Sequence, residues 1–171
     1  MSAIQYIRRE EIEGQARDAL VKAGIASAPI DPVQIAATDG IEVFSIDFAD
    51  DSVCGILRRE DGKYCIYVNQ DHHRLRMRYT IAHELGHYFL HRDNVSAFVD
   101  EELNLYRSKF PDESGEVDRM EVQANMFAAA LLMPENLLRD AYQESQDIAQ
   151  LARQFAVSRS AMGHRIINLG L

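Results

Sequence analysis

The sequence predicts an α+β protein, with helices first, then a small antiparallel sheet of three strands, then helices again. Three observations support this class. Apolar residues recur at helical spacing near the N-terminus and again in most of the second half of the chain. Between these regions lie short runs rich in Val, Ile, Phe and Tyr, which are typical of strands. An Asp-Gly pair separates two of these runs and predicts a hairpin.

Two helices are expected before the strands. Residues 8–23 have apolar positions at helical spacing and end at Gly24, which is typical of a helix C-terminus. Asp31 followed by Pro32 is typical of a helix start and predicts a short second helix through residue 37.

The three strands are expected between residues 41 and 69. Residues 41–48 predict the first strand, and residues 53–69 predict a hairpin that turns at Asp61-Gly62. A turn at this pair does not place Cys54 opposite Cys65, so we expect two buried free thiols and no disulfide.

The remainder of the chain is predicted to be helical outside residues 92–115, which are irregular and polar. Long helices are expected from about residue 71 to 91 and from about 116 to 133. Three short helices are expected over residues 135–168.

Composition and charge narrow the class of protein. The chain has 171 residues and a net charge of −9, which argues against direct nucleic-acid binding through bulk electrostatics. The longest uncharged stretch, residues 122–134, is too short to cross a bilayer. The N-terminal segment becomes charged where a signal peptide needs an apolar run. We therefore expect a cytoplasmic protein with no membrane partner.

Residues 83–87 read His-Glu-Leu-Gly-His within a helical stretch. Residues four apart lie one turn apart on one helix face, so His83 and His87 can bind a single Zn²⁺. Glu84 lies about 100° around the helix, where it can act as a general base toward a water. The motif also occurs by chance on solvated helices, but an apolar stripe on the opposite face indicates that this helix packs on a core.

A catalytic zinc needs a third protein ligand, and His91, Asp93, either cysteine and Glu121 are candidates. His91 lies eight residues after the first histidine, about 12 Å of helix rise, which is too far for one straight helix to bring both to one ion. Asp93 lies where a metzincin has its third ligand, but a leucine replaces the glycine that bends the chain there. The cysteines lack the surrounding motifs of peptide deformylases.

Glu121 is the favoured third ligand. It lies 34 residues after His87, near the start of an amphipathic helix, and shares a helix face with Asn125. This spacing parallels thermolysin-like zinc peptidases, in which a carboxylate binds the metal and a residue one turn later orients a ligand histidine. The alternative is an exposed glutamate favoured by the helix dipole. The small residues Ala124 and Ala128 permit close helix approach and favour the ligand interpretation.

Three stretches of the chain together resemble the ImmA/IrrE-type bacterial metallopeptidases. They are IYVNQ (66–70), RMRYTIAHELGHYFLH (76–91) and EVQANMFAAALLMP (121–134), in this order and at similar spacing. Weaker similarity extends through residues 28–43. The combined pattern is far more specific than the five-residue motif alone.

The resemblance implies a zinc metallo-endopeptidase that holds one Zn²⁺ per chain with His83, His87 and Glu121 as ligands and Glu84 as the catalytic base. Asn125 is expected to orient a ligand histidine. Characterised members of the family cleave helix-turn-helix repressors, so the implied partner is a basic helix-turn-helix repressor and the implied role is transcription regulation. We expect residues 1–135 to form the metallopeptidase domain and residues 136–171 a helical C-terminal extension.

Two surfaces are candidates for substrate binding. The segment 93–121 holds nine acidic and three basic residues, so it is either an acidic rim that attracts a basic substrate or an ordinary solvated loop. The strand at residues 63–69 leads into the active-site helix and is a candidate edge for substrate addition.

The C-terminal tail suggests an alternative function. Residues 147–171 have a helix-turn-helix cadence with three arginines, Arg153, Arg159 and Arg165. Three arginines in an acidic chain favour a helical pair that packs on the rest of the protein or contacts a partner over one that binds DNA. The alternative protein is a non-catalytic, metal-containing regulator that binds a repressor or DNA through these helices.

Overall fold

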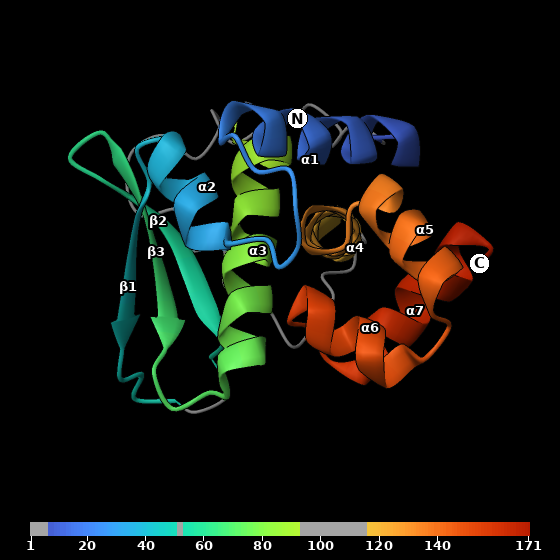
Figure 1. Cartoon of the computed structure of the whole chain (residues 1–171). Helices are drawn as coiled ribbons and strands as arrows, with labels where there is room; N and C mark the ends of the chain where they lie inside the picture. The colour runs from blue at the N-terminus through green and yellow to red at the C-terminus, as the bar shows by residue number, and fades with distance from the viewer. Residues whose placement is uncertain (1–6, 51–52, 93–115) are drawn as a thin grey trace.

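The computed structural model describes residues 7–50, 53–92 and 116–171 and shows an α+β fold. The sheet forms one outer layer, the long helix α3 packs beside it, and α4 and the C-terminal helices lie beyond α3 (Figure 1). The predicted fold class and its three strands are confirmed. No helix in these ranges is long and apolar enough to cross a membrane.

The N-terminal helices follow the sequence signals closely. Helix α1 spans Arg9–Lys22 and is followed by Gly24, whose φ of +68° is readily adopted only by glycine. Helix α2 spans Pro32–Thr38, and the Asp31 side chain accepts a hydrogen bond of 3.0 Å from the Val33 N–H at its start. Both helices are therefore set by local capping chemistry.

The sheet contains β1 (Glu42–Ile46), β2 (Gly55–Glu60) and β3 (Lys63–Asn69) in the order β1-β3-β2. Strands β2 and β3 form the predicted hairpin around Asp61-Gly62, where both residues have positive φ. Strand β1, however, pairs with β3 in parallel, so the expectation of a wholly antiparallel sheet is wrong. The sheet is mixed because β3, the most buried strand, takes the central position and the exposed β1 lies at an edge.

This strand order decides which backbone is free to pair with another chain. Strand β3 is hydrogen-bonded on both sides, so the expectation that it offers a substrate edge is wrong. Among the described residues, β2 pairs with β3 alone, so its other edge, next to α3, is free of a strand partner there. Strand order is a tertiary property, and the periodicity of a single strand does not record it.

Helices α3 (Arg74–His91) and α4 (Glu116–Leu132) cross at the centre of the molecule. They approach most closely at Gly86, where an added Cβ would lie 2.9 Å from both the Cα and the carbonyl oxygen of Ala124. Nearly every residue in the second half of α3 is buried, because the sheet covers one side of this helix and α4 the other (Figure 1). The predicted close approach at a small residue of α4 is confirmed.

The C-terminal region forms three short helices, as predicted: α5 (Glu135–Glu144), α6 (Ile148–Phe155) and α7 (Arg159–Leu169). The side chains of Asp147 and Ser158 accept hydrogen bonds from backbone N–H groups at the starts of α6 and α7. Buried apolar residues of all three helices join the same core as α1, α3 and α4. A domain boundary after residue 135 stays a prediction.

Candidate metal centre

Three side chains from two helices meet at one point. His83 and His87 of α3 place their Nε2 atoms 3.1 Å apart, 3.2 and 3.1 Å from the two carboxylate oxygens of Glu121 on α4. Both histidines are buried, and Glu121 is partly buried. These residues form a group in which one ligand atom from each lies within 4.8 Å of the others. The structure thus brings together the three residues expected from the sequence to be ligands.

The helix geometry explains why the three side chains converge. The two imidazoles are one turn apart on α3, with ring centroids 4.7 Å apart. Glu121 lies one turn before Ala124, the residue of α4 that touches the backbone at Gly86. A larger residue at Gly86 would separate the helices and move the carboxylate away from the imidazoles.

Asn125 contacts His83 from the neighbouring helix. Its side-chain oxygen lies 3.0 Å from Nδ1 of His83 and accepts a second hydrogen bond of 3.0 Å from the Tyr79 hydroxyl. An amide oxygen only accepts, so Nδ1 of His83 carries the hydrogen and a neutral ring turns the lone pair of Nε2 toward Glu121. The sequence pointed to Asn125 through its spacing from Glu121, whereas nothing in the sequence singled out Tyr79.

The donor set fits a divalent metal ion. Burial acts to raise the pKa of Glu121, but hydrogen bonding and charge from His83 and His87 outweigh it and hold the pKa well below its usual range. The carboxylate faces two imidazole nitrogens, and two histidines with one carboxylate are a ligand set of catalytic zinc sites. Tetrahedral zinc with bonds of about 2.0–2.1 Å places neighbouring ligand atoms roughly 3.3 Å apart. The observed separations are close to that value.

His91 does not join the ligand group and instead contacts His87. Its Nδ1 lies 3.2 Å from Nδ1 of His87, and its Nε2 lies 2.9 Å from the side-chain oxygen of Gln123 on α4. His91 is fully buried, and burial lowers its pKa to about 4, so the ring is neutral near pH 7. The rise of a straight helix excludes His91 as a ligand, and nothing in the sequence indicates its contacts with His87 and Gln123.

Glu84 lies on a different side of α3, buried against the start of β2. A Cβ added at Gly55 would lie 3.5 Å from a carboxylate oxygen of Glu84. The absence of a side chain at Gly55 therefore leaves the Glu84 carboxylate beside the backbone of the edge strand. The candidate base and the candidate substrate edge are neighbours.

The competing ligand candidates are placed elsewhere or lie outside the described residues. Cys54 and Cys65 are buried free thiols that do not belong to the ligand group, and Arg76 donates a hydrogen bond of 3.0 Å to the Cys54 sulfur. Burial raises the pKa of the Cys65 thiol. Asp93 and most of the acidic segment 93–121 lie outside the described residues.

A groove of about 570 Å³ lies beside the candidate metal centre. Tyr79 and Asn125 form part of its wall, and residues of α7, including His164, form the opposite side. The groove joins the surroundings of His83 to α7, so this helix forms part of the cleft next to the site.

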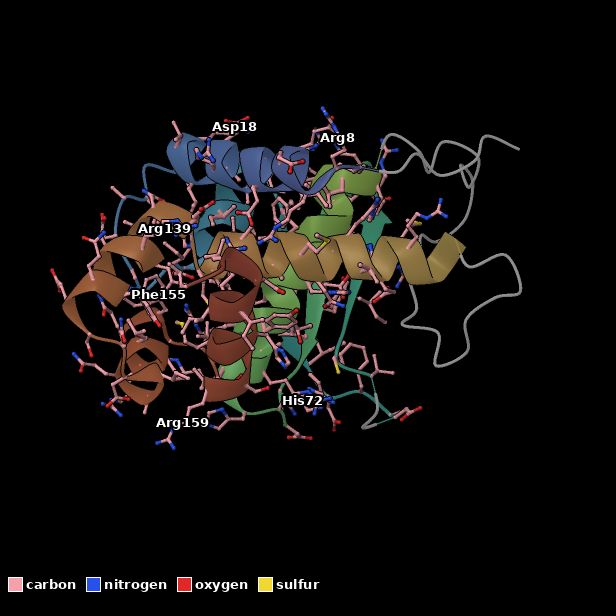
Figure 2. The ribbon with its side chains drawn as sticks, turned by 90° about the vertical axis from the view of Figure 1, so that its right-hand side faces the viewer. Arg8, Asp18, His72, Arg139, Phe155 and Arg159 are labelled. Carbon is pink, nitrogen blue, oxygen red and sulfur yellow. The ribbon has the colours of Figure 1, made fainter. Side chains whose placement is uncertain are left out.

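The three tail arginines do not form one exposed surface. Arg165 is buried and donates two hydrogen bonds, of 2.5 and 2.9 Å, to the Glu13 carboxylate on α1 and one of 3.0 Å to the backbone oxygen of Met133. Arg153 and Arg159 are exposed, and Figure 2 shows Arg159 pointing outward from the molecule. Arg165 thus joins α7 to the rest of the fold and is unavailable to DNA.

Comparisons with known proteins identify the family of this chain. The family model of the IrrE N-terminal-like domain, Peptidase_M78, matches residues 36–166. The chain therefore belongs to this family, and the resemblance noted in the sequence is confirmed.

Two relatives show how far the similarity extends. The chain is 28% identical over 120 residues to the metallopeptidase ImmA of Bacillus subtilis (strain 168), which covers 68% of this chain and 64% of ImmA. It spans less than two thirds of that relative. A solved Mycobacterium tuberculosis transcriptional regulator has the same fold, with a TM-score of 0.66 at 22% identity over 94% of this chain and 47% of that one.

Proposed function

We propose that the chain is a zinc-dependent endopeptidase whose metal is held by His83, His87 and Glu121. The observation that carries this proposal is the convergence of two imidazole nitrogens and a carboxylate at 3.1–3.2 Å between two helices. The ImmA relative is named a metallopeptidase, which supports the same activity. Two nitrogen donors and one carboxylate leave a fourth position open, as catalytic zinc sites require.

In the proposed reaction, Glu84 is the general base. Zinc bound at the site supplies a positive charge that polarises the scissile carbonyl and acidifies a water. The Glu84 carboxylate accepts a proton from the water that attacks the carbonyl carbon and delivers it to the leaving nitrogen as the peptide bond breaks. Asn125 keeps the Nε2 lone pair of His83 directed at the metal position.

The free edge of β2 is the proposed substrate-binding strand. A peptide that pairs with this edge would extend the sheet by one strand and use the unpaired backbone groups of β2. The edge begins at Gly55, next to the Glu84 carboxylate, so a bound peptide would pass close to the base. A peptide bound along this edge would be cleaved at a bond within its extended segment. We therefore propose an endopeptidase.

The proposed substrate is a basic helix-turn-helix repressor in the cytoplasm, which gives the enzyme a role in transcription regulation. The net charge of −9 favours association with a basic partner over an acidic one. The regulatory context of the fold neighbour, a transcriptional regulator, is consistent with such a target.

Cleavage of purified helix-turn-helix repressors by the zinc-loaded protein tests the proposal, with products identified by mass spectrometry. We expect wild type to cut at least one repressor and Glu84→Gln to be slower by about 100-fold or more, because the amide cannot accept the proton. Glu84→Gln is expected to keep its zinc. Equal cleavage by both proteins would remove Glu84 from the mechanism.

The same experiment separates the enzyme from a non-catalytic, metal-containing regulator. A regulator would bind a repressor without cutting it, and Glu84→Gln would then behave as wild type in every assay. Repressor binding without any wild-type cleavage would favour that alternative.

A further inference from the structure

The two ligand histidines of α3 reach an amide oxygen in different ways, His83 directly and His87 through a further histidine. Nδ1 of His83 meets an amide oxygen directly, whereas Nδ1 of His87 meets another histidine, which in turn meets an amide oxygen. The groups behind His87 are His91, at the end of α3, and Gln123, on α4. Both are almost completely buried, at 0% and 3% exposure.

The directions of these hydrogen bonds follow from the chemistry of the groups. An Nε2 lone pair of His87 that faces the metal position requires its hydrogen to be on Nδ1. That hydrogen points at Nδ1 of His91, which must then accept and carry its own hydrogen on Nε2. The Nε2–H of His91 points at the side-chain oxygen of Gln123, which can only accept.

Resting on the proposed zinc site, we propose that His91 and Gln123 are positioning residues that hold His87 in the tautomer able to bind the metal. The reverse arrangement would put a hydrogen on Nε2 of His87, where the metal must bind. Gln123 opposes that reversal because its oxygen accepts from His91. The side-chain oxygen of Gln123 faces His91 Nε2, and Gln123 Nε2 has no hydrogen-bond partner within the described parts of the chain.

The chain of contacts from His87 through His91 to Gln123, called the relay below, connects this ligand histidine of α3 to α4. His87 and His91 are on α3 and Gln123 is on α4, two residues after the ligand Glu121. Asn125, also on α4, plays the matching part for His83. Each ligand histidine of α3 is thus oriented by an amide oxygen of α4, once directly and once through His91.

Zinc affinity, measured by competition with a chelator, tests the relay without any peptidase assay. His91→Leu removes the acceptor of the His87 Nδ1–H, and Gln123→Leu removes the acceptor of the His91 Nε2–H. We expect zinc binding to weaken about 10–100-fold in each variant. His91→Asn is the conservative control, because its side-chain oxygen can take the place of the accepting Nδ1, and we expect affinity close to wild type.

A double variant separates the relay from a merely structural effect. In the His91→Asn background the acceptor no longer depends on Gln123, so adding Gln123→Leu should cost little zinc affinity. The unfolding midpoint of each metal-free variant reports any loss of stability. Equal losses from Gln123→Leu with and without His91→Asn would overturn the relay.

The tautomer itself is visible in long-range ¹H–¹⁵N spectra of the zinc-loaded protein. We expect the hydrogen of His91 on Nε2, and a hydrogen on Nδ1 would overturn the proposal.

If wild type binds no zinc, the proposed function fails and the relay with it. If wild type binds zinc and both leucine variants bind it equally tightly, the relay alone fails.

Discussion

Two regions of this molecule bury polar side chains in opposite ways. Between α3 and α4, the buried polar groups include His83, His87 and His91. The side chains of His83, His87 and Glu121 converge there on one point. The contacts of α7 with the rest of the protein bury a single charge, Arg165, among apolar residues. That charge meets a carboxylate and a backbone oxygen in direct hydrogen bonds.

The difference separates a structural from a functional buried charge. The guanidinium of Arg165 is satisfied by groups of the same chain, so nothing further is needed to explain its burial. The imidazole and carboxylate groups at the helix crossing converge instead on one point, where a cation could bind. Burial of a polar group is therefore informative only together with the direction of its hydrogen bonds.

The largest effect is expected from Arg165→Met, which breaks the structural member of the comparison. It leaves the Glu13 carboxylate without its buried partner, and we expect the free energy of unfolding to fall by about 3–5 kcal/mol. The folded fraction should still bind zinc as wild type does, because Arg165 makes no hydrogen bond to the ligands. Chemical denaturation with and without zinc measures both quantities, and a loss of zinc affinity in the folded protein would contradict the distinction.

A smaller loss of stability but a larger loss of metal binding is expected from Gly86→Ala. The new methyl group would meet the backbone of Ala124 at 2.9 Å, which cannot move without separating α3 from α4. Overpacking of this kind costs about 1–3 kcal/mol of unfolding free energy. Because the shift moves Glu121 away from the histidines, zinc affinity should also fall, and isothermal titration would detect it. Unchanged affinity would mean that the crossing does not position the ligands.

The smallest effect, with the opposite sign, is expected from Gly163→Ala in α7. Apart from its chain neighbours and the backbone of its own helix, no atom of the described residues lies within 4 Å of a Cβ built at Gly163, which is inside a helix with negative φ. The substitution should raise the free energy of unfolding by about 0.5–1 kcal/mol, because alanine loses less backbone entropy on folding. It is the matched control for Gly86→Ala, and destabilisation in thermal melts would contradict the open surroundings of this position.

Local chemistry made most of the fold predictable. The helix start at Asp31, the stop at Gly24 and the hairpin at Asp61-Gly62 each follow from a few neighbouring residues. The order of the strands did not follow, because parallel pairing of β1 with β3 depends on which strand is most deeply covered. The same strand order makes β2 an edge strand and places β3, the predicted edge, at the centre of the sheet.

The candidate site was predictable as far as helical spacing reaches. His83 and His87 lie one turn apart, and Glu121 and Asn125 share a face of the next long helix, so both pairs are visible in the sequence. Gln123 lies between the latter two and carries no such signal. Its contact with His91 spans 32 residues and depends on how closely α3 and α4 approach.

The metal content of the purified, zinc-loaded protein tests the central claim most directly. We expect about one zinc per chain in wild type and almost none in Glu121→Ala, which loses one of three ligands. Glu135→Ala, a glutamate of α5 paired with Arg139, is the matched control and should keep its zinc; Asp93→Ala should keep it too. Full zinc content in Glu121→Ala would contradict a metal centre shared by α3 and α4.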